Sequence, residues 1–384
     1  MSITAPQGFR AAGVAAGLKQ SAQPDVALVV NDGPASTAAG VFTGNRVVAA
    51  PVLWSRQVLK FRSLRAILLN SGGANACTGP QGFVDAHRSA EHAAAVLGLA
   101  PIDVAVCSTG LIGVPLNLPA LLGGVDAAAA ELSDEGGPAA ARAIMTTDSV
   151  PKEVVIRRHG AVVGGMAKGA GMIAPGMATM LAVLTTDAMI EPEVAERALR
   201  RAVDVTFNRI DSDGCMSTND TVLLMASGAG GAVLAATEAE EMLTEACDVL
   251  ARAIISDAEG ASKEILIEVT GAATEADAVA AARSVARSNL FKCAMYGEDP
   301  NWGRIVAAVG TSSAEFDPER LAVTINGVLL CEAGGPVSTV GDEPDLTGRR
   351  ISVVVDLGQG SHSGQVWTND LTPEYIRENS EYST

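Results

Sequence analysis

The sequence predicts an α/β or α+β fold with two lobes that share sheets. Short β-rich runs alternate with longer helical stretches, and no repeat occurs at the period of a solenoid. With 384 residues, the chain is long enough to bury a large core. Alanine and glycine are abundant whereas aromatic residues make up only 3%, so we expect a core of closely packed small aliphatic side chains.

Strands predominate among the elements predicted for the N-terminal half, where short apolar runs are typical of buried strands. These strands are predicted over residues 25–30, 66–69, 104–107, 153–158, 161–166 and 180–185. Two longer stretches with helical periodicity, residues 81–99 and 126–146, predict helices.

Helices and strands alternate in the C-terminal half. Residues 191–205 predict an amphipathic helix with Pro192 in its first turn, where a missing N–H removes no intrahelical hydrogen bond. Asn326-Gly327 favours a two-residue hairpin turn between strands at 321–325 and 328–330. The remaining elements are helices over 238–256 and 275–291 and strands over 221–226, 264–269 and 351–357.

The composition excludes several classes of partner. The formal net charge is −17 and no basic cluster offsets it, so we expect neither nucleic acid nor an anionic membrane as a partner. No apolar run reaches the roughly 18 residues of a membrane span. The apolar stretch 11–18 is interrupted by Gly13 and Gly17, so we expect no signal peptide or transit segment. Six scattered cysteines without a C-x-x-C pair favour reduced thiols and a cytoplasmic location.

The most informative segment, KGAGMIAPGMATMLAVLTTD, begins at Lys168 in the middle of the chain. A loop broken by glycines and Pro175 leads into Ala178-Thr179, and a strand-like apolar run follows at once. A threonine after a small residue in such a place is where a chain can cut itself. The new N-terminal threonine then has a hydroxyl nucleophile and its own α-amine as a base. The alternative for these residues is an ordinary turn before a buried strand.

Other segments carry a family resemblance. They read VFTGNRVVAAPV from Val41, NSGGANACTG from Asn70, CSTGLIGVPL from Cys107, MTTDSVPK from Met145, STNDTVLLMASG from Ser217, AEGASK from Ala258 and GEDPNWGRI from Gly297. In this order, and over essentially its whole length, the chain resembles the ArgJ family of ornithine acetyltransferases. One departure is Cys215-Met216, where the family pattern has Asp-Thr.

The resemblance implies that the chain cuts itself between Ala178 and Thr179. The products would be an alpha chain of residues 1–178 and a beta chain of residues 179–384 that begins with the nucleophile Thr179. The family fold is N-terminal-nucleophile-like, with layered helices and sheets in which the two cleaved chains are intertwined. A heterotetramer of two alpha and two beta chains is the expected assembly.

Thr109 and Gly110 follow the predicted strand 104–107, where a hydroxyl and a backbone N–H can face a cleft. Taken alone, these two residues are typical of a plain strand-to-loop turn. The resemblance implies that they form the oxyanion hole of an acyl transfer.

The resemblance also implies a set of substrate-binding residues: Thr146, Lys168, Thr179, Glu259, Asn379 and Thr384. Lys168 is a cation suited to a substrate carboxylate, and Glu259 is suited to an ammonium group, although each is also typical of a solvated side chain. Thr146 is preferred to Thr147 because of its spacing to Lys168. Asn379 and Thr384 belong to a tail that the family places over the active site.

The implied reaction is a ping-pong transfer of the acetyl group of N2-acetylornithine to glutamate through acetyl-Thr179, in arginine biosynthesis. Some family members also use acetyl-CoA. The reaction replaces one amide bond with another, so we expect no cofactor. The histidines and cysteines are scattered along the sequence, so we expect no metal site. Two alternatives remain open, namely a self-processing aminopeptidase or amidase that releases acyl groups to water, and an uncleaved binding protein for acidic amino acids.

Overall fold

The computed structural model describes residues 2–174, 180–337 and 343–381, and the mixed α/β class predicted from the sequence is confirmed. The chain forms two compact units. Among the described residues, the first contains those up to Asn208 together with Cys215–Asp257, and the second contains Arg209–Gly214 together with Ala258–Glu381. No helix in the described ranges combines the length and the hydropathy needed to cross a bilayer.

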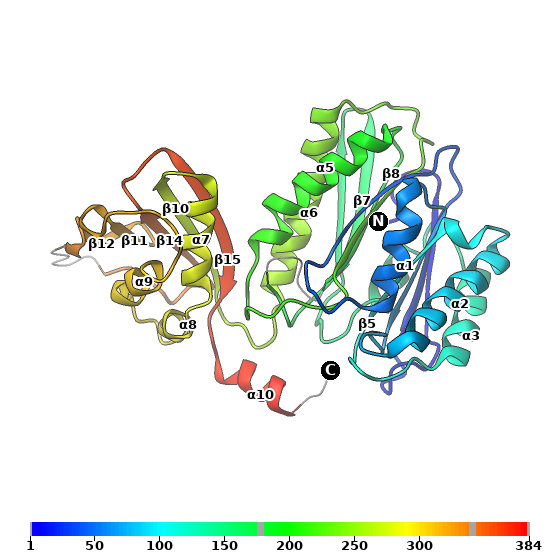
Figure 1. Ribbon diagram of the computed structural model, residues 1–384, viewed down its shortest axis with the longest axis horizontal. Helices are drawn as coiled ribbons and strands as arrows, with labels where there is room; N and C mark the ends of the chain where they lie inside the picture. The colour runs from blue at the N-terminus through cyan, green and yellow to red at the C-terminus, as the bar shows by residue number, and fades with distance from the viewer. Residues whose placement is uncertain (1, 175–179, 338–342, 382–384) are drawn as a thin grey trace. The chain divides into compact units, whose positions relative to one another are not determined.

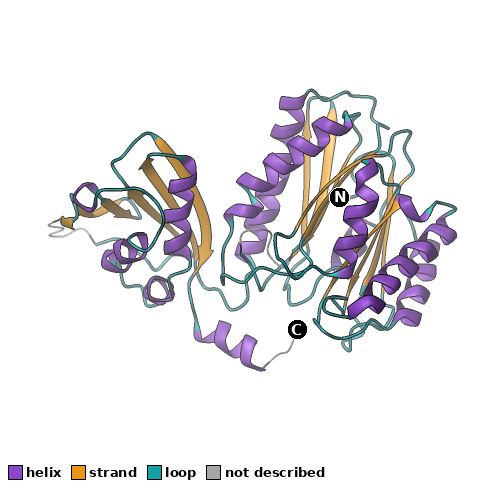
Figure 2. Ribbon diagram, viewed as in Figure 1, coloured by secondary structure: helices purple, strands orange, loops and turns teal. Residues whose placement is uncertain are grey.

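The first unit contains two sheets, visible as separate sets of strands in Figures 1 and 2. The smaller sheet has the order β1 (Phe9–Val14), β2 (Val26–Asn31), β4 (Ala66–Ser71) and β5 (Val104–Thr109). Its neighbours pair antiparallel except for β4 and β5, which run parallel. The helices that pack on these strands are α1 (Ala50–Val58), α2 (Gly79–Leu97), α3 (Leu118–Ala130) and α4 (Gly137–Ala143).

The larger sheet of the first unit has the order β3 (Thr37–Phe42), β9 (Thr221–Ala226), β8 (Leu181–Thr186), β7 (Ala161–Lys168) and β6 (Lys152–Arg158). Two helices, α5 (Pro192–Val205) and α6 (Ala236–Ser256), pack against it, as Figure 1 shows. Side chains of β8 and β9, such as Val183 and Leu223, join a hydrophobic core that also contains the inner residues of β2 and β4. The two sheets therefore share one core.

The order of the larger sheet matters for the predicted cut. Strands β3, β6 and β7 precede residue 178, whereas β8 and β9 follow it. Strand β8 is hydrogen-bonded to β7 on one side and to β9 on the other. Polypeptides cut before β8 would consequently remain joined through the ladders of one sheet.

The second unit is built on one sheet with the order β13 (Gly335–Pro336), β12 (Val328–Glu332), β11 (Ala322–Ile325), β14 (Arg350–Asp356), β10 (Glu264–Ala272) and β15 (His362–Asn369). Helix α7 (Glu275–Ala286) packs on β10 and β15, and α9 (Trp302–Val309) packs on α7. Helix α8 (Asn289–Tyr296) precedes α9, and α10 (Pro373–Glu381) follows β15.

Most predicted elements are present with shifted ends, and the hairpin at Asn326-Gly327 is confirmed by the pairing of Ile325 with Val328. Two predicted helices are wrong. Residues 126–146 contain the end of α3, a break, and α4, because Ser133 pairs with Ala11 of β1 through two backbone hydrogen bonds and Gly136 lies close against the same residue. Residues 275–291 break at Ser288, whose side chain caps α8 by accepting from the N–H of Phe291.

The expectation that the two lobes share sheets is also wrong. Each of the three sheets lies within a single unit, as the strand orders and the unit boundaries show. Several elements were not predicted, namely β1, β3, α1, α9, β15 and α10. The six cysteines are all free thiols in this structure.

Candidate active site

The candidate site lies at the end of the larger sheet where β8 begins. Ala178 and Thr179 fall outside the described residues, and Met180 is the first described residue after them. Leu181 pairs with Lys168 at the end of β7 and with Thr221 at the start of β9. Three strand ends therefore meet at Leu181, which follows the predicted nucleophile by two residues in the sequence.

Lys168 is buried at this strand end, with 1% of its surface exposed. Its Nζ donates to Thr146 Oγ1 at 3.2 Å. These two predicted substrate-binding residues are thus brought together although 22 residues separate them in the chain. The contact involves Thr146, the threonine preferred for its spacing to Lys168.

Asp148 connects the loop containing Thr146 to the glycine-rich loop after Lys168. Its carboxylate accepts from the backbone N–H of Thr146 at 2.9 Å and from that of Gly169 at 2.7 Å. Buried Lys152 donates to the same carboxylate at 2.6 Å. Burial by itself raises the pKa of Asp148, but Lys152, Lys168 and the Thr146 N–H outweigh it and hold that pKa below its usual value. Asp148 is therefore a carboxylate at neutral pH.

Thr109 and Gly110 lie at the end of β5, against the loop that joins β4 to α2. The backbone N–H groups of Gly72 and Gly73 both donate to the carbonyl oxygen of Thr109, at 2.9 and 3.0 Å. Gly110 has φ +130°, and a Cβ there would lie 2.6 Å from the nitrogen of Gly73. Only glycine fits this position, because the backbone is in a region that L residues avoid and a second backbone segment crosses it closely.

Asn219 joins the end of β5 to the start of β9. Its side-chain amide donates to the carbonyl oxygen of Ser108 at 2.8 Å and to that of Ala74 at 2.6 Å. Both the asparagine and Ser108 are buried. The predicted oxyanion-hole residue Thr109 is therefore tied, through its neighbour Ser108, to the loop that precedes β9.

Asp220, the next residue, holds the start of β8. Its Oδ1 accepts from the backbone N–H of Met180 at 3.0 Å, and the N–H of Thr221 donates to the carbonyl oxygen of Met180 at 3.2 Å. Asp220 has no exposed surface. Burial raises its pKa well above the usual value, and the Met180 N–H, Lys168 and Ser217 offset this only in part.

Glu259 and Asn379 belong to the second unit. Asn379 Nδ2 donates to Glu259 Oε2 at 3.1 Å, so these two predicted substrate-binding residues contact each other. The contact forms because α10 lies against the turn at Gly260, whose carbonyl oxygen accepts from Thr372 Oγ1 at 2.6 Å. Thr384 lies outside the described residues.

Comparisons with known proteins agree with the family resemblance. The ArgJ family profile matches residues 10–384. The chain belongs to the ArgJ family. It is 58% identical to the arginine biosynthesis bifunctional protein ArgJ of Streptomyces coelicolor, over 100% of both chains. It is 54% identical to the protein of the same name from Mycobacterium tuberculosis H37Rv, over 100% of this chain and 96% of that one.

A crystal structure of ornithine acetyltransferase from Mycobacterium tuberculosis, complexed with ornithine, is also similar. It is 59% identical, with a TM-score of 0.45, and the match covers 45% of this chain and 94% of that chain. The ArgJ-family membership predicted from the sequence motifs is confirmed by the whole-length matches.

Sequence reasoning missed three residues of this ArgJ-family site. Asp148, Asn219 and Asp220 lie within the motifs MTTDSVPK and STNDTVLLMASG, but no local pattern assigns a role to them. The sequence feature that could have revealed these residues is the position of acidic and amide side chains beside apolar strand residues, because a polar side chain buried there requires a hydrogen-bond partner. At the departure from the family pattern, Cys215 is exposed and the carbonyl oxygen of Met216 accepts from Asn45 Nδ2 at 2.9 Å.

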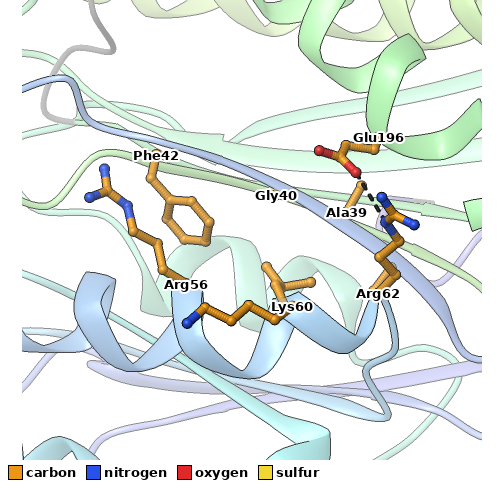
Figure 3. A pocket seen from close by; sticks show the side chains of 9 residues that line it. Ala39, Gly40, Phe42, Arg56, Lys60, Arg62 and Glu196 are labelled. Atoms are coloured by element: carbon orange, nitrogen blue, oxygen red, sulfur yellow. Dashed lines mark hydrogen bonds and ion pairs between the residues drawn. The ribbon is translucent and has the colours of Figure 1, made fainter. Parts of the chain in front are cut away.

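A cavity of about 300 Å³ lies elsewhere in the first unit of this ArgJ-family chain, alongside β3 and α1 (Figure 3). Arg56, Lys60 and Arg62 line it, and Arg62 pairs with Glu196 at 3.1 Å. None of the predicted site residues that the structure describes lines this cavity. Within the described residues, no group of three or more histidines, cysteines or carboxylates has an arrangement suited to a metal ion.

Proposed function

We propose that this chain is a glutamate N-acetyltransferase of arginine biosynthesis. It moves the acetyl group of N2-acetylornithine to glutamate through an acetyl-Thr179 intermediate. Membership of the ArgJ family supports the proposal, as do whole-length relatives named arginine biosynthesis bifunctional protein. The word bifunctional also fits a second activity that makes acetylglutamate from acetyl-CoA.

The enzyme matures by cutting itself between Ala178 and Thr179. The hydroxyl of Thr179 attacks the carbonyl of Ala178, the acyl group moves from nitrogen to oxygen, and water hydrolyses the resulting ester. The products are residues 1–178 and 179–384. The strand order supports this step, because β8 is paired on both sides with strands from either product and keeps them together.

The freed α-amine acts as the general base. Its pKa is about 7.7–8.0 in model peptides, so a substantial fraction is unprotonated near neutral pH. The amine takes the hydroxyl proton as Thr179 Oγ1 bonds to the acetyl carbon of acetylornithine. The proton then passes to the ornithine nitrogen as the amide bond breaks. Glutamate reverses these steps and leaves as acetylglutamate.

The negative charge that develops on the acetyl oxygen is stabilised by the Thr109 hydroxyl and the Gly110 N–H. The close packing of Gly110 against Gly73 supports this role, because donors must be held in place before the charge develops. Lys168, with Thr146, binds a substrate carboxylate. Glu259 binds the ornithine ammonium, and Asn379 and Thr384 complete the site.

One observation carries the proposal. A buried cation, Lys168, stands next to the first residues of β8, and the Ser108 end of β5 is tied to the same place through Asn219. An acyl transfer to a threonine before Met180 needs both a substrate-binding cation and an oxyanion site nearby.

The decisive experiment is the mass of the purified, active enzyme. Two chains are expected, one that ends with Ala178 and one that begins with Thr179. Thr179→Ala should abolish both cleavage and transfer, whereas Thr179→Ser should keep some cleavage because a hydroxyl remains. A single intact chain with full activity would contradict the proposal.

A second measurement separates transfer from hydrolysis. Acetylornithine is incubated with the enzyme with and without glutamate, and free ornithine is measured. The transferase should release ornithine at each turnover only when glutamate is present, after one initial equivalent. Equal release in both conditions would identify the aminopeptidase or amidase alternative.

We also propose an assembly of two alpha and two beta chains. We propose a cytoplasmic location for the enzyme, which the six free thiols fit. Size-exclusion chromatography with light scattering tests that assembly.

A further inference from the structure

The cavity alongside β3 (Figure 3) has a volume of about 300 Å³, and the proposed mechanism does not use it. Strand β3 is the last strand in the order of the larger sheet, so one of its edges is not paired with another strand of that sheet. The cavity is lined by β3, by α1 and the residues that follow it, and by α5. Its volume is at the lower end of the range for small-molecule sites.

The unpaired edge of β3 presents backbone hydrogen-bond donors. The N–H of Ala38 points away from β9 and donates to the carbonyl oxygen of Arg62 at 2.9 Å. Because the hydrogen-bonding direction alternates along a strand with one antiparallel neighbour, Gly40 and Phe42 also direct their N–H groups away from β9. Both residues line the cavity. Two backbone donors therefore face the side of β3 on which the cavity lies.

This edge is covered at both ends. At one end, Thr37 pairs with Ser63. At the other end, Arg56 Nη2 donates to the carbonyl oxygen of Thr43 at 2.7 Å. The uncovered stretch, residues 39–42, is shorter than the mean strand of about 5–6 residues. The edge therefore fits a small molecule better than an added strand from a partner protein.

The charged side chains that line the cavity are mainly cations, in a chain with a net charge of −17. Figure 3 shows Arg56 and Lys60 at the Phe42 end of the cavity. Arg62 lies at the other end, where Glu196 pairs with it at 3.1 Å. Arg56 instead donates to a neutral carbonyl group, and Lys60, four residues later, is exposed. Like charges at this spacing repel each other, so the Phe42 end of the cavity favours an anion.

We infer that this cavity binds the phosphate group of a small phosphate monoester. The phosphate lies at the Phe42 end, where Arg56 and Lys60 supply positive charge and the N–H groups of Gly40 and Phe42 supply further donors. A phosphate monoester has three terminal oxygens that accept hydrogen bonds, so it matches this number of donors better than a carboxylate with two oxygens. The inference goes beyond the proposed function and does not depend on it.

The rest of the cavity suits a body that carries hydroxyl groups. The side chains of Phe42 and Leu59 give it an apolar wall. At the far end, the Arg62–Glu196 pair offers both donors and acceptors to hydroxyl groups. A sugar phosphate or a mononucleotide combines a phosphate, hydroxyl groups and an apolar surface. Ribose 5-phosphate and AMP are therefore suitable probes.

Isothermal titration calorimetry of the purified full-length protein, in a dilute chloride buffer, tests the inference. The probes are ribose 5-phosphate and AMP, with adenosine and glutamate as ligands that lack a phosphate. At least one monoester should bind with a Kd of about 1 mM or lower. Adenosine and glutamate should bind at least about tenfold more weakly, because they lack the charge-assisted hydrogen bonds of the phosphate. Added salt should raise the Kd of the monoester, because it screens charges near the surface.

Lys60→Gln removes one positive charge from the cavity. It should raise the Kd of the monoester at least about fivefold, whereas Lys60→Arg should stay within about twofold of the wild type. Lys60 is exposed, so neither change disturbs the core. Arg88→Gln is the matched control, because it removes the same charge from an exposed position on α2 that does not line the cavity. Its Kd should equal that of the wild type.

A second measurement needs no variant. Acetylation of Lys60 by acetic anhydride is followed by peptide mapping, with and without the monoester that binds. The monoester should slow the acetylation of Lys60 and leave that of Lys19, which does not line the cavity, unchanged. The inference is overturned if neither monoester binds below about 10 mM, if Lys60→Gln leaves the Kd unchanged, or if Lys60 is not protected. Glutamate that binds as tightly as the monoesters would overturn the assignment to phosphate.

Discussion

Asn219 Nδ2 donates to the carbonyl oxygen of Ser108 at 2.8 Å and so joins the larger sheet of the first unit to the smaller one. Ser108 is followed by Thr109, and Asn219 is followed by Asp220, which binds Met180. A short series of buried hydrogen bonds thus connects the end of β5 to the start of β8. If the oxyanion hole and the nucleophile lie at these two strand ends, Asn219 fixes the distance between them.

Asn219→Ala should lower both stability and activity. The substitution leaves the carbonyl oxygens of Ala74 and Ser108 buried without this donor, at a cost of roughly 1–3 kcal/mol for each. We expect the Tm, followed by near-UV circular dichroism, to fall by about 5 °C or more. The exposed Gln20→Ala is the control and should leave the Tm unchanged. An Asn219→Ala enzyme with wild-type Tm and kcat would show that this connection is dispensable.

Gly110→Ala should disrupt the loop after β4. Its new Cβ would meet the nitrogen of Gly73 at 2.6 Å and the carbonyl carbon of Gly72 at 2.9 Å, in addition to the strain of φ +130°. Gly113→Ala is a matched control, because Gly113 has φ +82° but no atom lies within 4 Å of the point that its Cβ would occupy. Both variants should lose stability, and Gly110→Ala should lose more and also lose transfer activity. Equal Tm values for the two would contradict the close approach.

Asp148→Asn should destabilise the first unit in a pH-dependent way. The folded-state pKa of Asp148 lies below the usual 3.8, so its charge stabilises the fold above pH 3.8, and this stabilisation is lost as the pH falls below that value. We expect a loss of about 3 kcal/mol at pH 7, the low end for a broken buried ion pair, since Asp257 still contacts Lys152 at 2.6 Å. The Tm difference from wild type should be largest near neutral pH and should shrink in acid. A difference that is unchanged in acid would assign the effect to lost packing.

The sequence predicted those elements whose hydrophobic pattern is local. Strand β9 has the predicted ends, and Pro192 begins α5 as expected. The prediction of one helix over 126–146 was wrong. The alanine-rich periodicity continues past Gly136, but the helix is broken there by contact with β1, which lies more than a hundred residues earlier in the chain. Strand β15 was missed because its outward positions are polar and its pairing partner β10 is distant in sequence.

The same distinction applies to the site. The proximity of Thr146 to Lys168 follows from the short hairpin β6–β7, which brings the segment before β6 beside the end of β7, so spacing was informative. The contact of Asp220 with Met180 depends on the parallel register of β8 and β9, which no local pattern specifies. Motif matching marked the segment containing Asp220, but only the pairing of these strands reveals what the carboxyl binds.

The cysteines should divide into two reactivity classes. Cys77, Cys215 and Cys293 are exposed, whereas Cys107, Cys247 and Cys331 are buried. Burial raises the pKa of Cys107 to about 12 and also raises the pKa of Cys247, so neither forms appreciable thiolate near neutral pH. An Ellman titration should therefore find three fast thiols in the native enzyme and six in denaturant. Rapid modification of Cys107 in the native state, detected by peptide mapping, would contradict its burial.

Gly260→Ala should release the C-terminal helix from its contact with the turn before β10. Gly260 has φ +61°, and a Cβ there would lie 2.2 Å from the backbone nitrogen of Tyr375, so alanine cannot be accommodated while α10 stays in place. The Asn379–Glu259 hydrogen bond should break as α10 moves away. Trypsin should then cut after Arg377 several times faster than in the wild type, since a freed helix end is a better protease substrate.

Gly327→Ala is the matched control for that experiment. Gly327 has φ +84° in the β11–β12 hairpin of the same unit, and no atom lies within 4 Å of the place of a Cβ. It adds comparable backbone strain without touching α10, so its cleavage rate at Arg377 should match the wild type. If α10 carries substrate-binding residues, Gly260→Ala should also raise KM for acetylornithine while leaving self-cleavage complete. Faster proteolysis with an unchanged KM would show that the tail is docked on this turn but takes no part in binding the substrate.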